Sequence, residues 1–174
     1  MTSFKIAVLA LTLGFTTALP AMAHVSLETG TAKIGANYKA VLRVPHGCDG
    51  KATTGVRVRL PEGVISAKPM PKAGWKLDKT LGDYAKAYTL HGEQATNGVR
   101  EITWSGGRLL DDEYDEFVFR AYITDSFKAN QMIAFPVIQM CEDGATTRWI
   151  EVPAEGKSAD DYEHPAPAVK LVNP

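Results

Sequence analysis

The sequence predicts an all-β protein, an antiparallel β-sandwich, from three observations. Short segments alternate between apolar and polar residues, Gly and Pro interrupt them, and no amphipathic helix pattern follows residue 23. Many short alternating segments at intervals of roughly 10–15 residues are typical of two antiparallel sheets packed face to face. The expected architecture is immunoglobulin-like or cupredoxin-like.

The first half of the chain supplies several of these strands. Residues 38–44 alternate up to Pro45, and residues 55–60 place three apolar side chains on one face and two arginines on the other. Residues 75–77 and 85–90 are expected to be the two arms of a hairpin whose turn is Leu81-Gly82-Asp83.

The second half supplies four more strands. Residues 100–104 end at a pair of glycines, and residues 116–123 alternate clearly. Residues 133–140 are more continuously apolar, and Pro136 within them indicates an edge strand or a bulge. Residues 148–152 form the last expected strand.

The first 23 residues have the pattern of a secretory signal peptide. Lys5 precedes an apolar run over residues 6–19, and Ala21-Met22-Ala23 forms a cleavage site. Removal would leave 151 residues, the size of one domain. We expect this domain over residues 24–153, followed by a Pro-rich segment over residues 154–174 that is extended and mobile or laid across the sandwich.

Charge and hydropathy limit the classes of partner that we expect for the mature chain. It would carry 18 basic and 20 acidic residues, a net charge of −2, which gives no electrostatic footprint for nucleic acid. No second apolar stretch approaches the roughly 20 residues that a membrane helix needs. The signal peptide and these absences together predict an exported, periplasmic protein without a membrane span.

Cys48 and Cys141 are the only cysteines of the chain. In an oxidising compartment, an even pair of cysteines predicts a disulfide. The alternative is a thiolate ligand in a blue-copper centre, which needs two histidines and usually a His or Met soon after the cysteine. Glu142-Asp143-Gly144 follow Cys141, so the disulfide is favoured.

Cleavage after Ala23 would make His24 the first residue, with a free amine. This amine and the imidazole Nδ1 of the same residue can close a chelate ring on a metal, and such nitrogen ligands favour Cu(II). Two nitrogens leave other positions open, so further ligands must come from the fold. The alternative is that a histidine at the new terminus is incidental.

The other histidines are His46, His91 and His164. His46 lies in a turn before Cys48 and is either a second ligand or a solvent-exposed residue. His91 begins a turn and is expected to be solvated, and His164 could be a flexible ligand from the C-terminal segment. The absence of H-x-H, H-x₃-H and C-x₂-C spacings argues against a zinc site.

Two further residues are candidates for the metal site. Glu116 ends the acidic run of residues 111–116 and begins a strand, so its carboxylate could reach a metal held at the sheet edge. Trp149 ends a strand, and its indole either packs in the core or lies beside a copper ion that it shields from water.

Eight short motifs occur together in this chain. In order they are His24-Val25-Ser26, Val44-Pro45-His46-Gly47-Cys48, Pro61-Glu62-Gly63-Val64, Gly74-Trp75-Lys76, Ile102-Thr103-Trp104-Ser105-Gly106-Gly107, Asp115-Glu116-Phe117, Gln139-Met140-Cys141 and Arg148-Trp149. The pattern resembles the YcnI-like copper-binding domain, an exported bacterial family long catalogued as a domain of unknown function. The resemblance extends from residue 24 to about Val152.

The resemblance implies a β-sandwich that binds Cu(II) through a mono-histidine brace. The amine and imidazole of His24 would bind the metal, Glu116 would add a carboxylate, and Trp149 would lie close by. Glu113 and Asp115 are near enough in sequence to replace Glu116 as the ligand. The resemblance also implies the Cys48–Cys141 disulfide and the company of copper import and copper chaperone proteins.

We therefore expect a periplasmic Cu(II)-binding protein without catalytic activity, a metallochaperone or store in copper trafficking or homeostasis. Its expected partners are other periplasmic copper chaperones or a membrane copper transporter. The three methionines after residue 23 form no cluster of the kind that binds Cu(I). One alternative is a copper-dependent oxidative enzyme with a second imidazole from His46, His91 or His164. Another is a structural or interaction sandwich that binds no metal.

Overall fold

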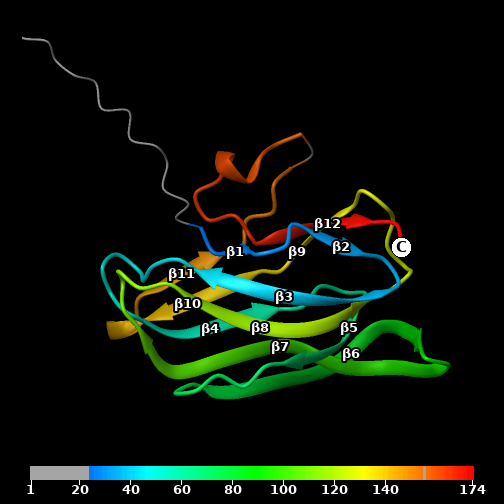
Figure 1. Cartoon of the computed structure of the whole chain (residues 1–174), viewed down its shortest axis with the longest axis horizontal. Helices are drawn as coiled ribbons and strands as arrows, with labels where there is room; N and C mark the ends of the chain where they lie inside the picture. The colour runs from blue at the N-terminus through cyan, green and yellow to red at the C-terminus, as the bar shows by residue number, and fades with distance from the viewer. Residues whose placement is uncertain (1–23, 155) are drawn as a thin grey trace, which may run out of the picture.

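The computed structural model describes residues 24–154 and 156–174, so the predicted signal peptide over residues 1–23 lies outside the described residues. Within that part of the chain, twelve strands form three sheets (Figure 1). The strands are β1 (Ser26–Leu27), β2 (Thr31–Lys33), β3 (Ala36–Val44), β4 (Thr53–Arg59), β5 (Val64–Pro69), β6 (Lys76–Leu90), β7 (Glu93–Leu109), β8 (Asp115–Ile123), β9 (Met132–Ala134), β10 (Val137–Cys141), β11 (Thr146–Trp149) and β12 (Ala168–Val172). Two short 3₁₀ turns lie at Glu142–Gly144 and Ala159–Asp161.

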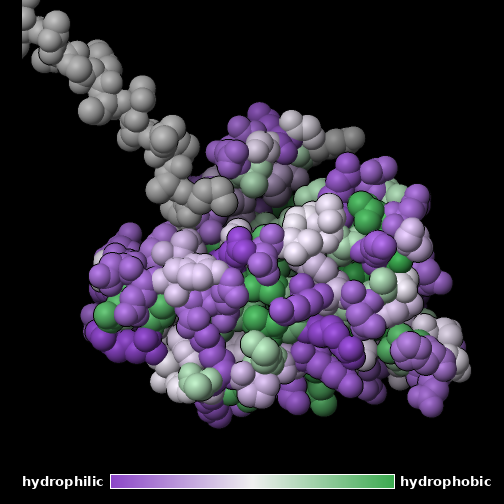
Figure 2. All heavy atoms as spheres, in the orientation of Figure 1, coloured by the Kyte–Doolittle hydropathy of each residue, from purple (hydrophilic) through white to green (hydrophobic). Residues whose placement is uncertain are grey.

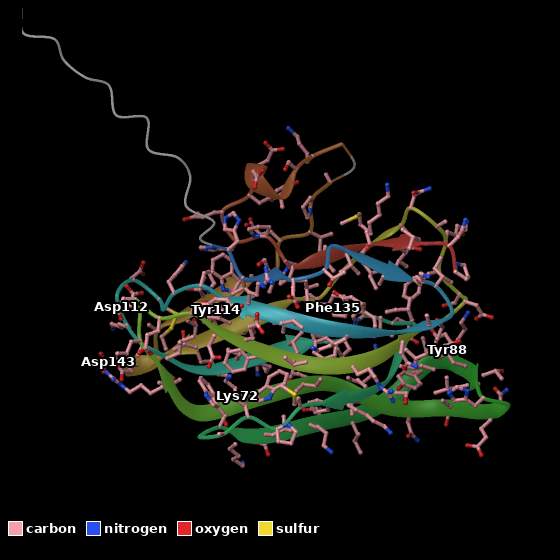
Figure 3. All side chains as sticks on the ribbon, in the orientation of Figure 1. Lys72, Tyr88, Asp112, Tyr114, Phe135 and Asp143 are labelled. Atoms are coloured by element: carbon pink, nitrogen blue, oxygen red, sulfur yellow. A yellow bond between two sulfur atoms is a disulfide. The ribbon has the colours of Figure 1, made fainter. Side chains whose placement is uncertain are left out.

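The predicted antiparallel sandwich is confirmed. One sheet has the strand order β1-β3-β8-β5 and the other the order β11-β10-β4-β7-β6, with antiparallel pairing throughout both. Burial alternates along β8 and β10, as period-two patterning requires for strands with one face on the core. In Figure 3, Phe135 lies between the layers, where it is fully buried.

Trp104 anchors the centre of this core. Its indole is fully buried on β7 and packs edge-on against Phe117 of β8, with the ring centroids 5.6 Å apart. Trp75 packs on the same phenyl ring from 4.9 Å. The indole nitrogen of Trp104 donates a hydrogen bond to the carbonyl of Met70 at 3.0 Å, so burial of the ring leaves no polar atom unsatisfied.

The expected hairpin over residues 75–90 is wrong. Residues 76–90 form one long strand, β6, which pairs with β7, and the turn lies at His91-Gly92 instead. Leu81-Gly82-Asp83 lies within the strand beside a register shift and pairs with residues 97–99 of β7. A side chain at Gly98 would collide with the hydroxyl of Tyr84, so Gly98 allows the two strands to continue past this point.

A second, smaller cluster supports the outer part of the β6–β7 ribbon. Tyr84 and Tyr88 pack edge-on at 5.7 Å and bury Ile65. The hydroxyl of Tyr88 donates to Glu62 at 2.8 Å, and Figure 3 shows Tyr88 at the end of the sandwich away from Asp112.

The expected strand over residues 133–140 is divided at Pro136. Residues before the proline form β9, and residues after it form β10. Pro136 has no amide hydrogen, but its carbonyl accepts from the amide of Arg59 at 2.9 Å. The break takes the chain from the small third sheet into the five-stranded sheet.

The C-terminal segment lies across the sandwich. In Figure 1 the residues after β11 rise over β1 and return as β12. β12 pairs in parallel with β2 and antiparallel with β9, and Val169 and Leu171 are fully buried in the main core. This segment therefore contributes to the same core as the two main sheets.

The surface shown in Figure 2 is mainly polar, with apolar side chains in small groups. Among the residues that the structure describes, no helix is long and apolar enough to cross a membrane.

The expected Cys48–Cys141 disulfide is present and joins residues 93 positions apart. It ties the loop before β4 to the end of β10, and both half-cystines are buried.

Removing this bond should destabilise the protein substantially. Without the large closed loop, the unfolded chain has more conformational entropy, which favours unfolding. For C48A/C141A we expect the free energy of unfolding, measured by urea titration, to fall by roughly 4–5 kcal/mol. The reduced wild-type protein should show a similar loss. Urea midpoints equal to that of the oxidised protein would contradict the prediction.

Candidate functional site

His24 and Trp149 meet beside β1 and β11, which are edge strands of the two main sheets. His24 directly precedes β1, and Trp149 is the last residue of β11. Their ring centroids lie 5.7 Å apart with an interplanar angle of 61°, an edge-on contact. His24 is half-buried and Trp149 is 3% exposed. The structure therefore brings together two of the three predicted site residues.

The indole of Trp149 is held in place by a buried polar network. Its Nε1 donates to Oε1 of Gln139 at 2.9 Å. The amide nitrogen of Gln139 donates to the carbonyl of His46 at 2.6 Å and to Oγ1 of Thr53 at 2.7 Å. Gln139 and Thr53 are both fully buried, so turning the indole would leave polar groups unsatisfied in the core.

Two other imidazoles border the same indole. The ring centroid of His46 lies 6.3 Å from that of Trp149, and that of His164 lies 5.2 Å away. Both histidines are half-buried, whereas the sequence favoured a solvent-exposed turn for one and a flexible segment for the other. His91 is exposed at the β6–β7 turn, with its ring near Tyr122.

The backbone of His164 is fixed against the end of β11. Its amide donates to Oε2 of Glu151 at 2.6 Å. Its carbonyl accepts from the amides of Ile150 and Glu151, both at 3.1 Å. The Nδ1 atom of its ring is shielded from solvent and has no hydrogen-bond partner among the described residues.

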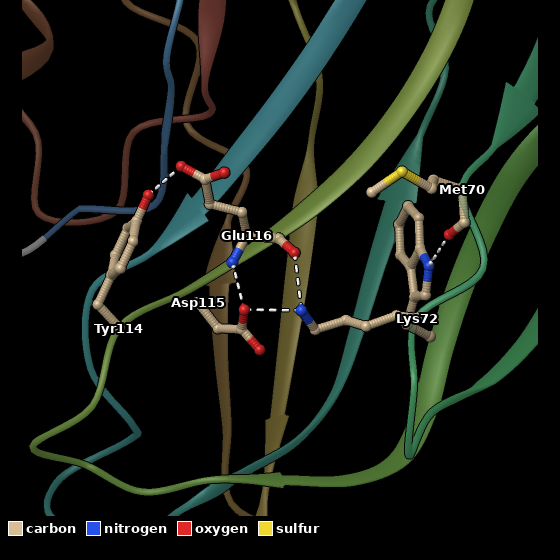
Figure 4. Close-up of polar contacts among 6 residues, drawn as sticks. Met70, Lys72, Tyr114, Asp115 and Glu116 are labelled. Carbon is tan, nitrogen blue, oxygen red and sulfur yellow. Dashed lines mark hydrogen bonds and ion pairs between the residues drawn. The ribbon is translucent and has the colours of Figure 1, made fainter.

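Glu116 lies on β8 opposite Arg43 of β3, which in turn lies opposite Ser26 of β1. Its carboxylate accepts a hydrogen bond from the hydroxyl of Tyr114 (Figure 4). It also pairs with Nε of Arg43 at 3.6 Å. Arg43 also pairs with Glu28 at 3.0 Å. The structure thus places Glu116 in this charged group and gives it no contact with His24 in the described part of the chain.

The hydroxyl of Tyr114 is suited to hold this carboxylate. Reduced hydration of the hydroxyl, and then its hydrogen bond to the Glu116 carboxylate, raise the pKa of Tyr114. The phenol therefore remains protonated and donates at neutral pH.

The two carboxylates that could replace Glu116 have other partners. Asp115 binds Nζ of Lys72 at 2.6 Å and accepts from the amide of Glu116 at 2.8 Å (Figure 4). Glu113 accepts from the amide of Leu110 at 3.1 Å and closes a turn. In residues 24–154 and 156–174, no three His, Cys, Asp or Glu side chains form a group that could hold a metal ion.

Sequence reasoning missed Gln139 at this site, and it considered His164 only as a flexible ligand from the C-terminal segment. Gln139 shares the inward face of β10 with the buried Val137 and Cys141, and a polar residue at an inward position is a signal that could have identified it. His164 carries no such signal, because its place beside Trp149 depends on a contact between distant parts of the chain.

One similar solved structure supports the immunoglobulin-like fold. The chain is similar to an uncharacterized protein from Nocardia farcinica with an immunoglobulin-like fold, at 26% identity and a TM-score of 0.62, covering 86% of this chain and 99% of that one. A cohesin module from a family 33 glycoside hydrolase of Clostridium perfringens matches at 11% identity and a TM-score of 0.43, covering 87% and 97% of the two chains. No curated protein matches.

A family comparison covers nearly all of the described chain. Residues 24–171 match the family described as "Domain of unknown function (DUF1775)". The match begins at His24 and extends through most of β12, so it includes the C-terminal segment that carries His164. The chain therefore belongs to the DUF1775 family.

Proposed function

We propose that this protein binds Cu(II) at His24 once residues 1–23 have been removed, and that it serves in periplasmic copper trafficking or homeostasis without catalysis. The observation that carries the proposal is the contact of the His24 ring with the fixed indole of Trp149. The resemblance to the YcnI-like copper-binding domain supports the same assignment.

The chemistry of the residues at this position fits a copper ion. The freed amine and Nδ1 of His24 would hold the ion in a chelate ring, and nitrogen ligands suit Cu(II). The indole of Trp149 would shield one side of the ion, since an aromatic face attracts a cation and excludes water. Nearby, the shielded Nδ1 of His164 is a polar atom without a partner in the described chain, which is consistent with a site completed by a ligand.

Glu116 is the proposed carboxylate ligand. Two strand spacings separate it from Ser26, about 10 Å between Cα atoms, so it would approach the ion only by extending along the sheet surface. Its side chain is 38% exposed, and Arg43 can remain paired with Glu28 when Glu116 turns away. Glu116 should therefore contribute less to affinity than His24.

The position of the amine makes binding depend on processing. While residues 1–23 remain attached, the nitrogen of His24 is part of a peptide bond and cannot bind a metal. An extra residue at the mature terminus would have the same effect on this nitrogen.

Adding one alanine before His24 should abolish the tight copper site. The chelate ring cannot close when the His24 nitrogen is an amide, so the apparent Kd for Cu(II), measured by chelator competition, should rise at least about a hundredfold. A control with one alanine added after Pro174 should bind like the correctly processed protein. Full affinity in the N-terminally extended protein would refute the proposed ligand set.

Copper binding should weaken as the pH falls. A free α-amine has a pKa of about 7.7–8.0 and must lose its proton to bind, so each unit below that range should cost about tenfold in apparent affinity from this group alone. The measurement is chelator competition between pH 5.5 and 7.5. An affinity that does not change over this range would exclude the amine as a ligand.

Substitution of the proposed ligands should give graded losses. H24A should lose the chelate and the nitrogen couplings of the Cu(II) electron paramagnetic resonance spectrum. E116Q should keep the nitrogen couplings and lose about tenfold in affinity, because one charged ligand becomes neutral. An E116Q protein with unchanged affinity and spectrum would show that Glu116 is not a ligand.

A further inference from the structure

We infer that His164 supplies a second imidazole nitrogen to the copper site at His24. This inference rests on the proposed function and extends it, because it adds a ligand from the other end of the chain. Both imidazoles lie against the indole of Trp149, with ring centroids 5.7 and 5.2 Å from it.

His164 is held in a fixed position, as a metal ligand must be. Three hydrogen bonds fix its backbone to Ile150 and Glu151, immediately after Trp149. The next residue, Pro165, is buried and forms a bridge with Glu151. A histidine held in this way loses little conformational freedom when it binds a ligand.

The Nδ1 atom of His164 is shielded from solvent and has no hydrogen-bond partner among the described residues. Burying a polar atom without a partner costs free energy, so proteins seldom keep one without a reason. A metal ion is a partner that would satisfy this nitrogen. A neutral imidazole with its proton on Nε2 presents a lone pair on Nδ1, as a ligand must.

His46, the other imidazole beside Trp149, differs from His164 in its contacts. The Nδ1 of His46 lies 2.6 Å from the carbonyl of Gly47, and its own carbonyl accepts from Gln139. His46 therefore already has a structural role in the turn that leads to Cys48. The hydrogen bonds of His164 involve its backbone, and its ring Nδ1 has no partner among the described residues.

His24 is anchored on one side only. Val25, buried in the main core, joins it to β1, and cleavage after Ala23 would release the other side of the residue. The His24 ring can then turn on the indole toward His164, whose backbone is fixed. An amine and two imidazoles provide three nitrogen ligands, a set that favours Cu(II) further.

The test compares H164F with the correctly processed wild-type protein. Phenylalanine keeps a ring on Trp149 but removes the nitrogens. We expect the apparent Kd for Cu(II) to rise at least about tenfold. This is the lower end of the loss in affinity when a residue that only hydrogen-bonds to a metal ligand is removed. The electron paramagnetic resonance spectrum should lose the coupling of one nitrogen. H164Q should behave similarly, and near-ultraviolet circular dichroism should show that Trp149 stays packed in both variants.

Two control variants make the result specific. H91N changes an exposed histidine in a left-handed turn that Asn tolerates, and it should bind copper like the wild type. H46F should leave the nitrogen couplings unchanged, and loss of a coupling in H46F but not in H164F would overturn the inference in favour of His46.

The outcomes separate the inference from the proposed function. If the wild-type protein binds Cu(II) tightly and H164F matches it in affinity and spectrum, the inference is wrong and the proposed function stands. If the wild-type protein binds no more tightly than a His-Val-Ser peptide, the proposed function itself fails.

Discussion

The buried amide of Gln139 is the interaction on which the candidate site depends. It joins the indole of Trp149 to the carbonyl of His46 and to Thr53, inside a core that is otherwise largely apolar. Such a network is stable only when every member is satisfied, which fixes the orientation of each one. The disulfide at Cys48 holds the same turn, so covalent and polar constraints act together on the surface that His24 meets.

The site draws on both ends of the described chain. His24 precedes the first strand, whereas Trp149 and His164 come from the last quarter of the sequence. The β2–β12 pairing joins these ends, and the backbone contacts between His164 and Glu151 complete the connection. A region that sequence composition marks as a Pro-rich extension is therefore part of the structure that surrounds the proposed metal site.

The sequence predicted the sandwich well because alternation reports directly on which face of a strand is buried. The alternation of residues 116–123, for example, gives β8 almost to the residue. It failed over Leu81-Gly82-Asp83, because turn residues also occur within strands where the opposite strand supplies Gly98. At the site, His24 and Trp149 were predicted and do meet. The contacts of His164 join distant parts of the chain, so no periodic pattern in the sequence predicts them.

The parallel pairing of β2 with β12 has a consequence for the order of folding. Residues 31–33 cannot find their partner until residues 170–172 have been synthesised. The surroundings of His24 are thus completed only when the end of the chain is in place, although His24 directly precedes the first strand. Any property of His24 that depends on these surroundings therefore arises only when the whole domain closes.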